Sequence, residues 1–347
     1  MLSRRRLLAV ALVGALVGTG TYAVSAARLP SAPTKVDVTA TPITSFDNRD
    51  PGKTRFGALE FRGGLALTAS FEPFGGISAI RVEPDGSRFL AVTDRGSWLR
   101  GRIVYRDGRP DGVADIEMAP ILGADGKPLA EKGWYDVESL TERDGLIYLG
   151  IERVQKIVRF DFKRDGFQAR GEAVAAPADF ATLSSNKGLE CLTAAPKQSA
   201  LAGKLITVSE RSLDGAGNLR AYAVDGKVAG DVFDNHPMRF SVKRSDEFEV
   251  SDCAILPPGD LLLLERRYSP ARGVGMRIRR VPLTAIKEGA TVDGAILIDV
   301  DLAYQIDNME GMALHRNAAG ETVITLVSDD NFSVIQRNLL LQFVLVE

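Results

Sequence analysis

The chain has 347 residues, with 43 Lys and Arg against 45 Asp and Glu, 45% hydrophobic residues, two Cys and two His. This composition excludes a disordered chain, a collagen-like chain, a small disulfide scaffold and a polytopic membrane protein. The net charge of −2 gives no electrostatic case for nucleic-acid binding, and the two histidines are too few for a His-rich zinc site and leave a Ser-His-Asp triad unsupported.

Residues 1–27 have the pattern of an export signal, with three arginines at Arg4–Arg6, a short apolar run and small residues up to Ala27. The apolar run is too short for a comfortable membrane span, and the arginine pattern resembles a twin-arginine signal. A general secretory signal and an uncleaved membrane anchor are the alternatives. Residues 28–55 are polar and rich in Pro, Thr and Ser, and we interpret them as a leader or linker.

Export would place Cys191 and Cys253 in an oxidising compartment, where a disulfide is permitted. Both residues lie in expected strands of different repeats. The alternative is that they are two small buried apolar side chains.

From residue 56 onward a two-strand pattern recurs. A Gly-rich or acidic segment opens a short apolar strand, a turn follows, and a second apolar strand ends in an acidic residue. The opening strands of the five copies are 74–80, 136–140, 187–192, 249–255 and 308–314. The second strands, with the polar residues that end them, are 89–96, 147–153, 205–211, 261–266 and 323–330.

The copies follow one another at roughly 60 residues, which leaves room for two further strands in each and is typical of large propeller blades. We therefore predict an all-β protein whose residues 56–347 form one β-propeller of five four-stranded blades. An additional strand near residues 58–68 is expected to complete the last blade and close the ring. A degenerate sixth blade, a β-solenoid and a β-sandwich remain as alternatives.

The first strand of each blade lines the central channel of a propeller, so equivalent residues of these strands meet around the axis. Several carboxylates that close repel one another, and a hard divalent cation relieves the repulsion. Oxygen ligands favour Ca²⁺, with Mg²⁺ and Mn²⁺ as alternatives. The alternative to a metal site is that these acids point into solvent or pair with basic residues. The candidate metal ligands are Ser78, Glu138, Glu190, Asp252 and Glu310.

An arginine follows the acid at the end of four second strands and is expected at one mouth of the channel. Arginine recognises phosphate or carboxylate through two parallel hydrogen bonds, so these residues are candidates for substrate binding. The alternative is that the acid–Arg pairs bridge neighbouring blades. The candidates are Arg95, Arg153, Arg211 and Arg266.

At these residues the chain resembles the phytase-like family described as "esterase-like activity of phytase". The resemblance rests on the segments 75–78, 92–96, 136–140, 186–190 and 308–312 and extends over nearly the whole chain after residue 56. It implies a propeller and suggests hydrolysis of phosphate or other esters. The axial set also resembles calcium-dependent nucleotidases with five-bladed rings, from which Asp252 departs, whereas the Lys-rich face of propeller phytases is not evident.

These observations favour an exported, periplasmic or secreted hydrolase that uses Ca²⁺ and acts on a small anionic ester. We expect a monomer that contacts a membrane only through an uncleaved signal, if at all. The competing hypothesis is a non-catalytic propeller that binds a ligand or partner protein around a structural metal. The sequence assigns no residue to the chemical step.

Overall fold

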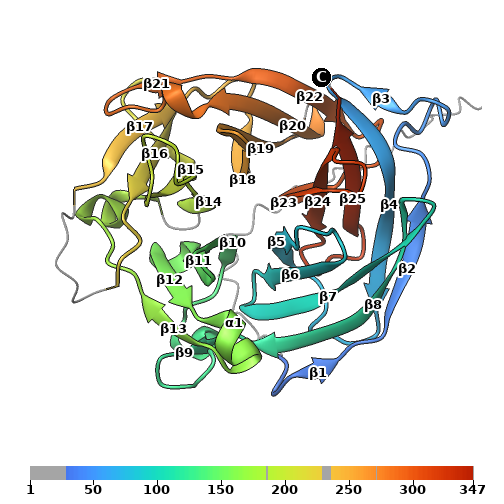
Figure 1. Ribbon diagram of the computed structural model, residues 1–347, viewed down its shortest axis with the longest axis horizontal. Helices are drawn as coiled ribbons and strands as arrows, with labels where there is room; N and C mark the ends of the chain where they lie inside the picture. The colour runs from blue at the N-terminus through green and yellow to red at the C-terminus, as the bar shows by residue number, and fades with distance from the viewer. Residues whose placement is uncertain (1–28, 185–186, 229–235, 271, 347) are drawn as a thin grey trace, which may run out of the picture.

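Five antiparallel sheets stand around a common axis in the computed structural model, which describes residues 29–184, 187–228, 236–270 and 272–346 (Figure 1). The predicted all-β fold and the count of five blades are confirmed. The export signal predicted at residues 1–27 lies outside the described residues.

Each blade is a short meander whose first strand is innermost. Blade 1 contains β5 (Ile77–Val82), β6 (Arg88–Thr93), β7 (Ser97–Arg106) and β8 (Arg109–Pro120), with β1 (Thr34–Lys35) outermost. Blade 2 contains β10 (Val137–Arg143), β11 (Leu146–Ile151), β12 (Lys156–Phe160) and β13 (Arg170–Ala173), with β9 (Leu122–Gly123) outermost. Blade 3 contains β14 (Leu189–Ala194), β15 (Leu205–Leu213), β16 (Leu219–Val224) and β17 (Met238–Val242), with β21 (Thr291–Val292) outermost. Blade 4 contains β18 (Glu249–Leu256), β19 (Asp260–Ser269), β20 (Gly273–Pro282) and β22 (Ala295–Asp301).

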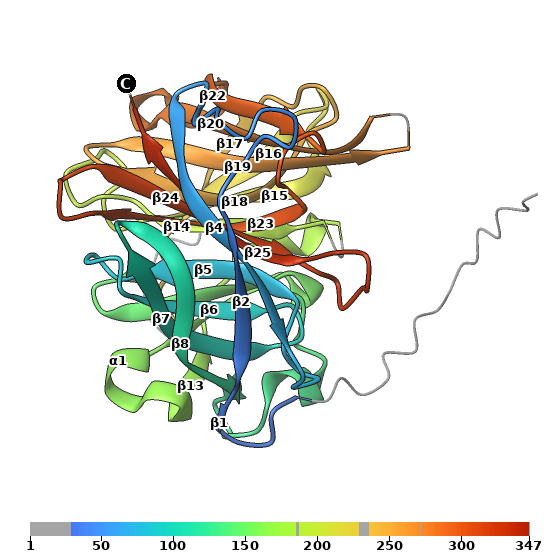
Figure 2. The same ribbon diagram turned by 90° about the vertical axis from the view of Figure 1, so that its right-hand side faces the viewer.

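The fifth blade joins the two ends of the described chain. Its strands β23 (Asn308–Arg316), β24 (Thr322–Asp329) and β25 (Asn338–Leu345) are followed in space by β4 (Leu59–Ala69) and β2 (Val38–Ile43), and β3 (Arg55–Phe56) pairs with β4 (Figures 1 and 2). The antiparallel pairing of β25 with β4 is the expected closure by an N-terminal strand. It leaves the C-terminal strand without an open edge.

The segment 28–55, interpreted from sequence as a leader or linker, contributes β1 and β2 to the propeller. Strand β2 pairs with β4 from Val38 to Ile43. The hydrophobic pattern of β2 is weak because an outermost strand is covered by the protein on one side only. Pro42 is tolerated because an edge strand does not need a backbone N–H donor at every position. The structural part of the chain thus starts before residue 56.

Hydrophobic clusters fill the spaces between neighbouring sheets. Trp98 of blade 1 packs edge-on against Phe160 of blade 2, with ring centroids 5.2 Å apart. At the closure, Phe46 lies within 5.4 Å of the rings of Phe61 and Phe343. Burying one such ring contributes about 1.5–3 kcal/mol, so these contacts hold the blades in a fixed arrangement around the axis.

The helical elements are single turns in the connections. They are α1 (Phe162–Asp165) and the 3-10 turns η1 (Leu129–Lys132), η2 (Glu152–Val154), η3 (Gly166–Gln168), η4 (Ala178–Thr182) and η5 (Leu283–Ala285). Among the described residues, no helix is long and apolar enough to cross a membrane.

Candidate metal centre

The five innermost strands β5, β10, β14, β18 and β23 contact one another around the axis. Each of them carries a register shift near its start, where it pairs with the second strand of its blade. A bulge inserts one extra residue and redirects its side chain. The five residues in these bulges, here called the bulge ring, are Ser78, Glu138, Glu190, Ser251 and Glu310.

The bulge ring contains four of the five predicted metal ligands, and in the fourth blade the bulge holds Ser251 instead of the predicted Asp252. Val250 pairs with Glu265 before the shift, and Asp252 pairs with Leu264 after it, so Ser251 is the bulged residue. Asp252 instead uses both carboxylate oxygens as acceptors, from the backbone N–H of Cys253 and of Met312, each at 2.7 Å. Its buried carboxylate therefore bridges blade 4 to blade 5 through the backbone.

A second set of side chains lies near the ends of the second strands. In each blade, one residue of the second strand pairs with the residue just before the bulge, and the next residue along the second strand belongs to this set. This set, here called the mouth ring, comprises Asp94, Glu152, Glu210, Arg266 and Asp329. Aligning acid with acid in the sequence placed Glu265 in this set, but the register gives its position to Arg266. Glu265 lies one residue earlier and is buried against Arg279, with Oε1–Nη2 and Oε2–Nε distances of 2.6 and 2.7 Å.

The two rings bring several carboxylates together. One oxygen each of Glu152, Glu190 and Glu210 lies within 4.8 Å of the other two, and all three side chains are buried. Glu152 also accepts a hydrogen bond of 2.6 Å from the backbone N–H of Gly188. This trio is the tightest part of the candidate centre.

The surroundings of several acids in the two rings raise their pKa values. Burial, followed by repulsion from neighbouring carboxylates, raises the pKa of Glu138 and of Glu190 well above its usual range. Burial raises the pKa of Glu152 to about 7 and that of Glu310 to about 8. Burial and the Asp329 carboxylate raise the pKa of Asp94 well above its usual value. The carboxylates of both rings therefore repel one another across the axis.

Cations from the chain offset part of this repulsion. The Nη2 atom of Arg266 lies 3.0 Å from Oε1 of Glu210, and its Nε atom lies 3.1 Å from Oε2 of Glu310. Lys187 Nζ lies 2.9 Å from Oε2 of Glu210. Asn308 donates a hydrogen bond of 2.7 Å to Glu310. Glu210 and Glu310 are thus partly neutralised from within the protein.

The residues present fit a hard divalent cation. The donors are carboxylate and hydroxyl oxygens, which Ca²⁺ prefers. The Oδ1 atom of Asp94 is buried without a hydrogen-bond partner among the described residues. Ser78 donates its hydroxyl proton to the carbonyl of Val137 at 2.5 Å, so the oxygen's remaining lone pairs are free to act as acceptors.

Glycines allow the strands to approach this centre closely. Gly76 has φ +64° and donates its N–H to Asp330, and a Cβ atom there would lie 2.1 Å from Oδ1 of Asp94. The Gly-rich segment that opens the first repeat therefore makes room for the acid of the mouth ring.

The four predicted substrate-binding arginines have different surroundings. Arg266 reaches the acidic centre. The guanidinium carbon of Arg95 lies 3.1 Å above the ring centroid of Phe332, and that of Arg153 lies 5.1 Å from the centroid of Tyr135. Arg211 forms an ion pair with Glu249 of the next blade. This contact is of the kind expected under the alternative that these arginines bridge neighbouring blades.

Cys191 and Cys253 form a disulfide between β14 and β18. The bond joins the innermost strands of blades 3 and 4 directly beside Glu190 and Asp252. It therefore holds together the two strands that carry Glu190 and Ser251 of the bulge ring.

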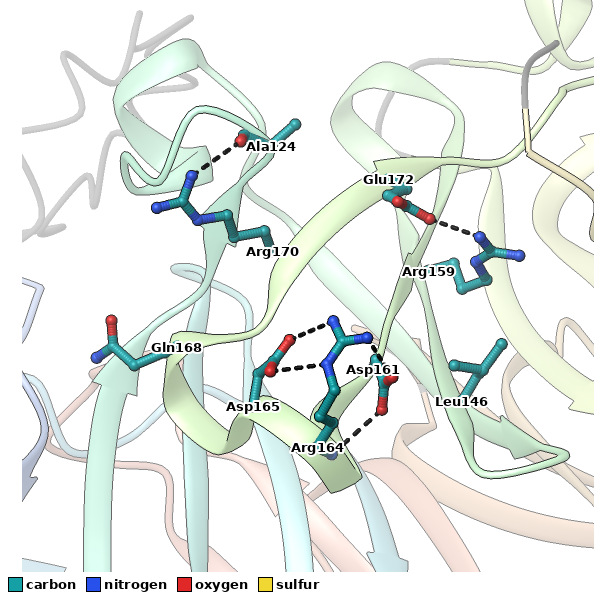
Figure 3. Close-up of a pocket in the computed structure, with 9 residues that line it drawn as sticks. All are labelled: Ala124, Leu146, Arg159, Asp161, Arg164, Asp165, Gln168, Arg170 and Glu172. Atoms are coloured by element: carbon teal, nitrogen blue, oxygen red, sulfur yellow. Dashed lines mark hydrogen bonds and ion pairs between the residues drawn. The ribbon is translucent and has the colours of Figure 1, made fainter.

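A separate cavity of about 670 Å³ lies against α1 and blade 2 (Figure 3), and α1 and β13 lie at the outside of the ring (Figure 1). Arg164 contacts Asp165 at 2.7 Å, Arg159 contacts Glu172 at 2.5 Å, and Arg170 donates a hydrogen bond of 3.5 Å to the carbonyl of Ala124. The charged side chains of this pocket thus already have partners within the protein, and we assign the candidate site to the axis.

Fold and site together define a five-bladed propeller with a buried acidic centre at one end of its axis. The model of the phytase-like family, described as "Esterase-like activity of phytase", matches residues 72–332. The chain belongs to this family. The comparison with curated proteins found no match.

The solved structures that align with this chain share few identical residues with it. Glutaminyl cyclase from Myxococcus xanthus is 12% identical with a TM-score of 0.40, over 79% of this chain and 92% of that chain. The PQQ-bound aldose sugar dehydrogenase from Streptomyces coelicolor is 12% identical with a TM-score of 0.43, over 91% and 99%. The alpha-L-arabinanase from Cellvibrio cellulosa in complex with arabinohexaose is 9% identical with a TM-score of 0.41, over 76% and 90%. None of these similarities bears on the chemistry of the site.

Proposed function

We propose that the protein is an exported, calcium-dependent hydrolase of a phosphorylated or other anionic ester. The observation that carries the proposal is the convergence of the bulge ring and the mouth ring on one buried acidic centre. Glu152, Glu190 and Glu210 would hold the ion, with Glu138 and Glu310 as further ligands. Membership of the phytase-like family supports ester hydrolysis as the reaction class.

The chain's own residues would bind and orient the substrate. Arg266 and Lys187 carry positive charge beside the centre, and both are partly exposed, so they are available to the anionic group of an ester. A bound Ca²⁺ would supply positive charge that polarises a phosphoryl or carbonyl oxygen. The backbone N–H of Gly188 would keep Glu152 in place during binding.

The disulfide supports the export part of the proposal. A buried Cys–Cys bond persists in oxidising compartments and is rare in the cytosol. Together with the signal-like residues 1–27, it favours a periplasmic or secreted location.

A non-catalytic propeller with a structural metal is the second candidate. It is favoured by the ion pairs that cross between blades, since Arg211 contacts Glu249 and Arg266 contacts both Glu210 and Glu310. In that case the arginines would hold the ring together, and the mouth would bind a partner or ligand without turnover.

The two candidates are separated by a panel of phosphate and carboxylate esters assayed with Ca²⁺ and with a chelator. Turnover should require Ca²⁺ and should be lost in Glu190→Gln, which removes one charge from the centre and leaves the side-chain shape. Glu172→Gln is the matched control because Glu172 is exposed on the outside of blade 2. Turnover that survives Glu190→Gln would refute the axial site, and calcium binding without turnover on any ester would support the binding propeller.

A further inference from the structure

The fourth blade is the one that departs from the acidic pattern of the mouth ring, and in the bulge ring it carries Ser, as blade 1 does. It supplies Ser251 where three blades supply Glu, and Arg266 where four blades supply Asp or Glu. Arg266 therefore places a permanent positive charge at a position where the repeat elsewhere carries a negative one.

The contacts of Arg266 are those of an internal counter-ion. Its guanidinium spans two blades, since Nη2 meets Glu210 of blade 3 at 3.0 Å and Nε meets Glu310 of blade 5 at 3.1 Å. A third contact of 3.3 Å joins Nη1 to the side-chain oxygen of Asn308. The two carboxylates are 3% and 7% exposed, whereas the arginine side chain is 27% exposed. The carboxylates are fixed inside, and the arginine reaches them from the mouth.

A metal ion and Arg266 would compete for the same oxygens. Oε1 of Glu210 contacts Arg266 and Oε2 contacts Lys187, so each carboxylate oxygen of Glu210 already has a cationic side chain beside it. An ion bound by Glu152, Glu190 and Glu210 must share an oxygen or displace one of the cations. Its charge would also repel the guanidinium at close range.

We propose that Arg266 is an exchangeable internal cation of the acidic centre, which the divalent ion displaces toward the channel mouth, where the guanidinium binds the anionic group of the substrate. The inference rests on the proposed function, because the divalent ion and the anionic substrate both come from that proposal. It adds an order of binding, in which the ion comes first and strengthens binding of the anion. It also explains why one blade departs from the acidic pattern of the mouth ring.

The test is calcium titration calorimetry on the purified full chain after removal of metal, comparing wild type with Arg266→Gln and Arg267→Gln. Arg267 is the matched control because it follows Arg266 but lies over the ring of Phe248, 4.6 Å from its centroid. Loss of the competing charge should tighten calcium binding by about tenfold or more in Arg266→Gln and by less than about twofold in Arg267→Gln. Equal or weaker calcium binding in Arg266→Gln would overturn the competition.

Failure of the metal hypothesis is distinguishable from failure of this inference. If wild type binds no Ca²⁺, the calcium part of the proposed function is wrong, and the counter-ion role is decided by melting in chelator. Arg266→Gln should then melt about 5 °C or more below Arg267→Gln, because its carboxylates lose their partner. Equal melting temperatures would overturn the inference.

A second variant and an anion probe complete the test. Arg266→Lys keeps the charge but cannot span two carboxylates, so its calcium affinity should fall between those of wild type and Arg266→Gln, and an affinity below wild type would contradict displacement. Methylphosphonate should bind wild type more tightly in the presence of Ca²⁺. An equal calcium-dependent gain in Arg266→Gln would show that Arg266 is not released to the anion.

Discussion

Removal of Arg279 should destabilise the protein strongly, because it would leave Glu265 charged, buried and unpaired. The two side chains are 1% and 2% exposed and are joined by two contacts of 2.6 and 2.7 Å. Breaking such a buried pair costs about 3–5 kcal/mol of unfolding free energy. We expect this loss in Arg279→Met, measured by urea unfolding at constant Ca²⁺.

The double variant Glu265→Met, Arg279→Met should recover most of the lost free energy, because two apolar side chains need no partner. Arg159→Met is the exposed control, since its partner Glu172 is 57% exposed, and it should cost less than about 1 kcal/mol. A small loss in Arg279→Met, or a double variant as unstable as the single one, would refute the assignment of Glu265 as one half of a structural ion pair.

The pH dependence of Arg279→Met has a definite sign. Burial already raises the pKa of Glu265 above its ordinary value of 4.5, even though Arg279 opposes the shift. Without Arg279 the folded-state pKa should rise further. A carboxyl whose folded-state pKa is raised stabilises the fold most below its unfolded pKa and loses that contribution as the pH rises through the folded value. The destabilisation should therefore be smallest near pH 4.5 and grow toward neutral pH.

Three further changes test other parts of the structure. Asp252→Ala should lower the unfolding free energy by about 2–4 kcal/mol, because the backbone N–H groups of Cys253 and Met312 lose their acceptor, whereas calcium affinity measured by calorimetry should change less than about twofold. Replacing Cys191 and Cys253 by Ser should cost about 4 kcal/mol in urea unfolding, because the bond closes a loop with a sequence separation of 62. Phe343→Ala at the closure should cost about 3–5 kcal/mol in the same assay, and a loss below 1 kcal/mol would contradict its role in holding the ring closed.

The propeller could be predicted from the sequence because its signal is repeated five times. Each copy has a polar or Gly-rich opening and two apolar strands, so an error in one copy changes little. Strand β2 was missed because it occurs once, lies outermost and has the sequence Val-Thr-Ala-Thr-Pro-Ile, in which apolar and polar residues alternate weakly. The pairing of Cys191 with Cys253 also required the structure, since only the packing of β14 beside β18 brings the two residues together.

The fourth blade shows why site residues are harder to predict than the fold. The sequence offers Glu265-Arg266 where three other copies offer an acid followed by Arg. Asp252 lies near the expected carboxylate position, and matching acid to acid gives a consistent ring. Register is decided instead by pairing and burial, since Val250 opposite Glu265 places Ser251 in the bulge and turns Glu265 toward Arg279. A shift of one residue sends a strand side chain to the opposite face, so the two alignments assign opposite charges to one position. Asp252 and Glu265 of blade 4 are thus held by structural contacts, whereas Arg266 of the same blade contacts acids of the centre.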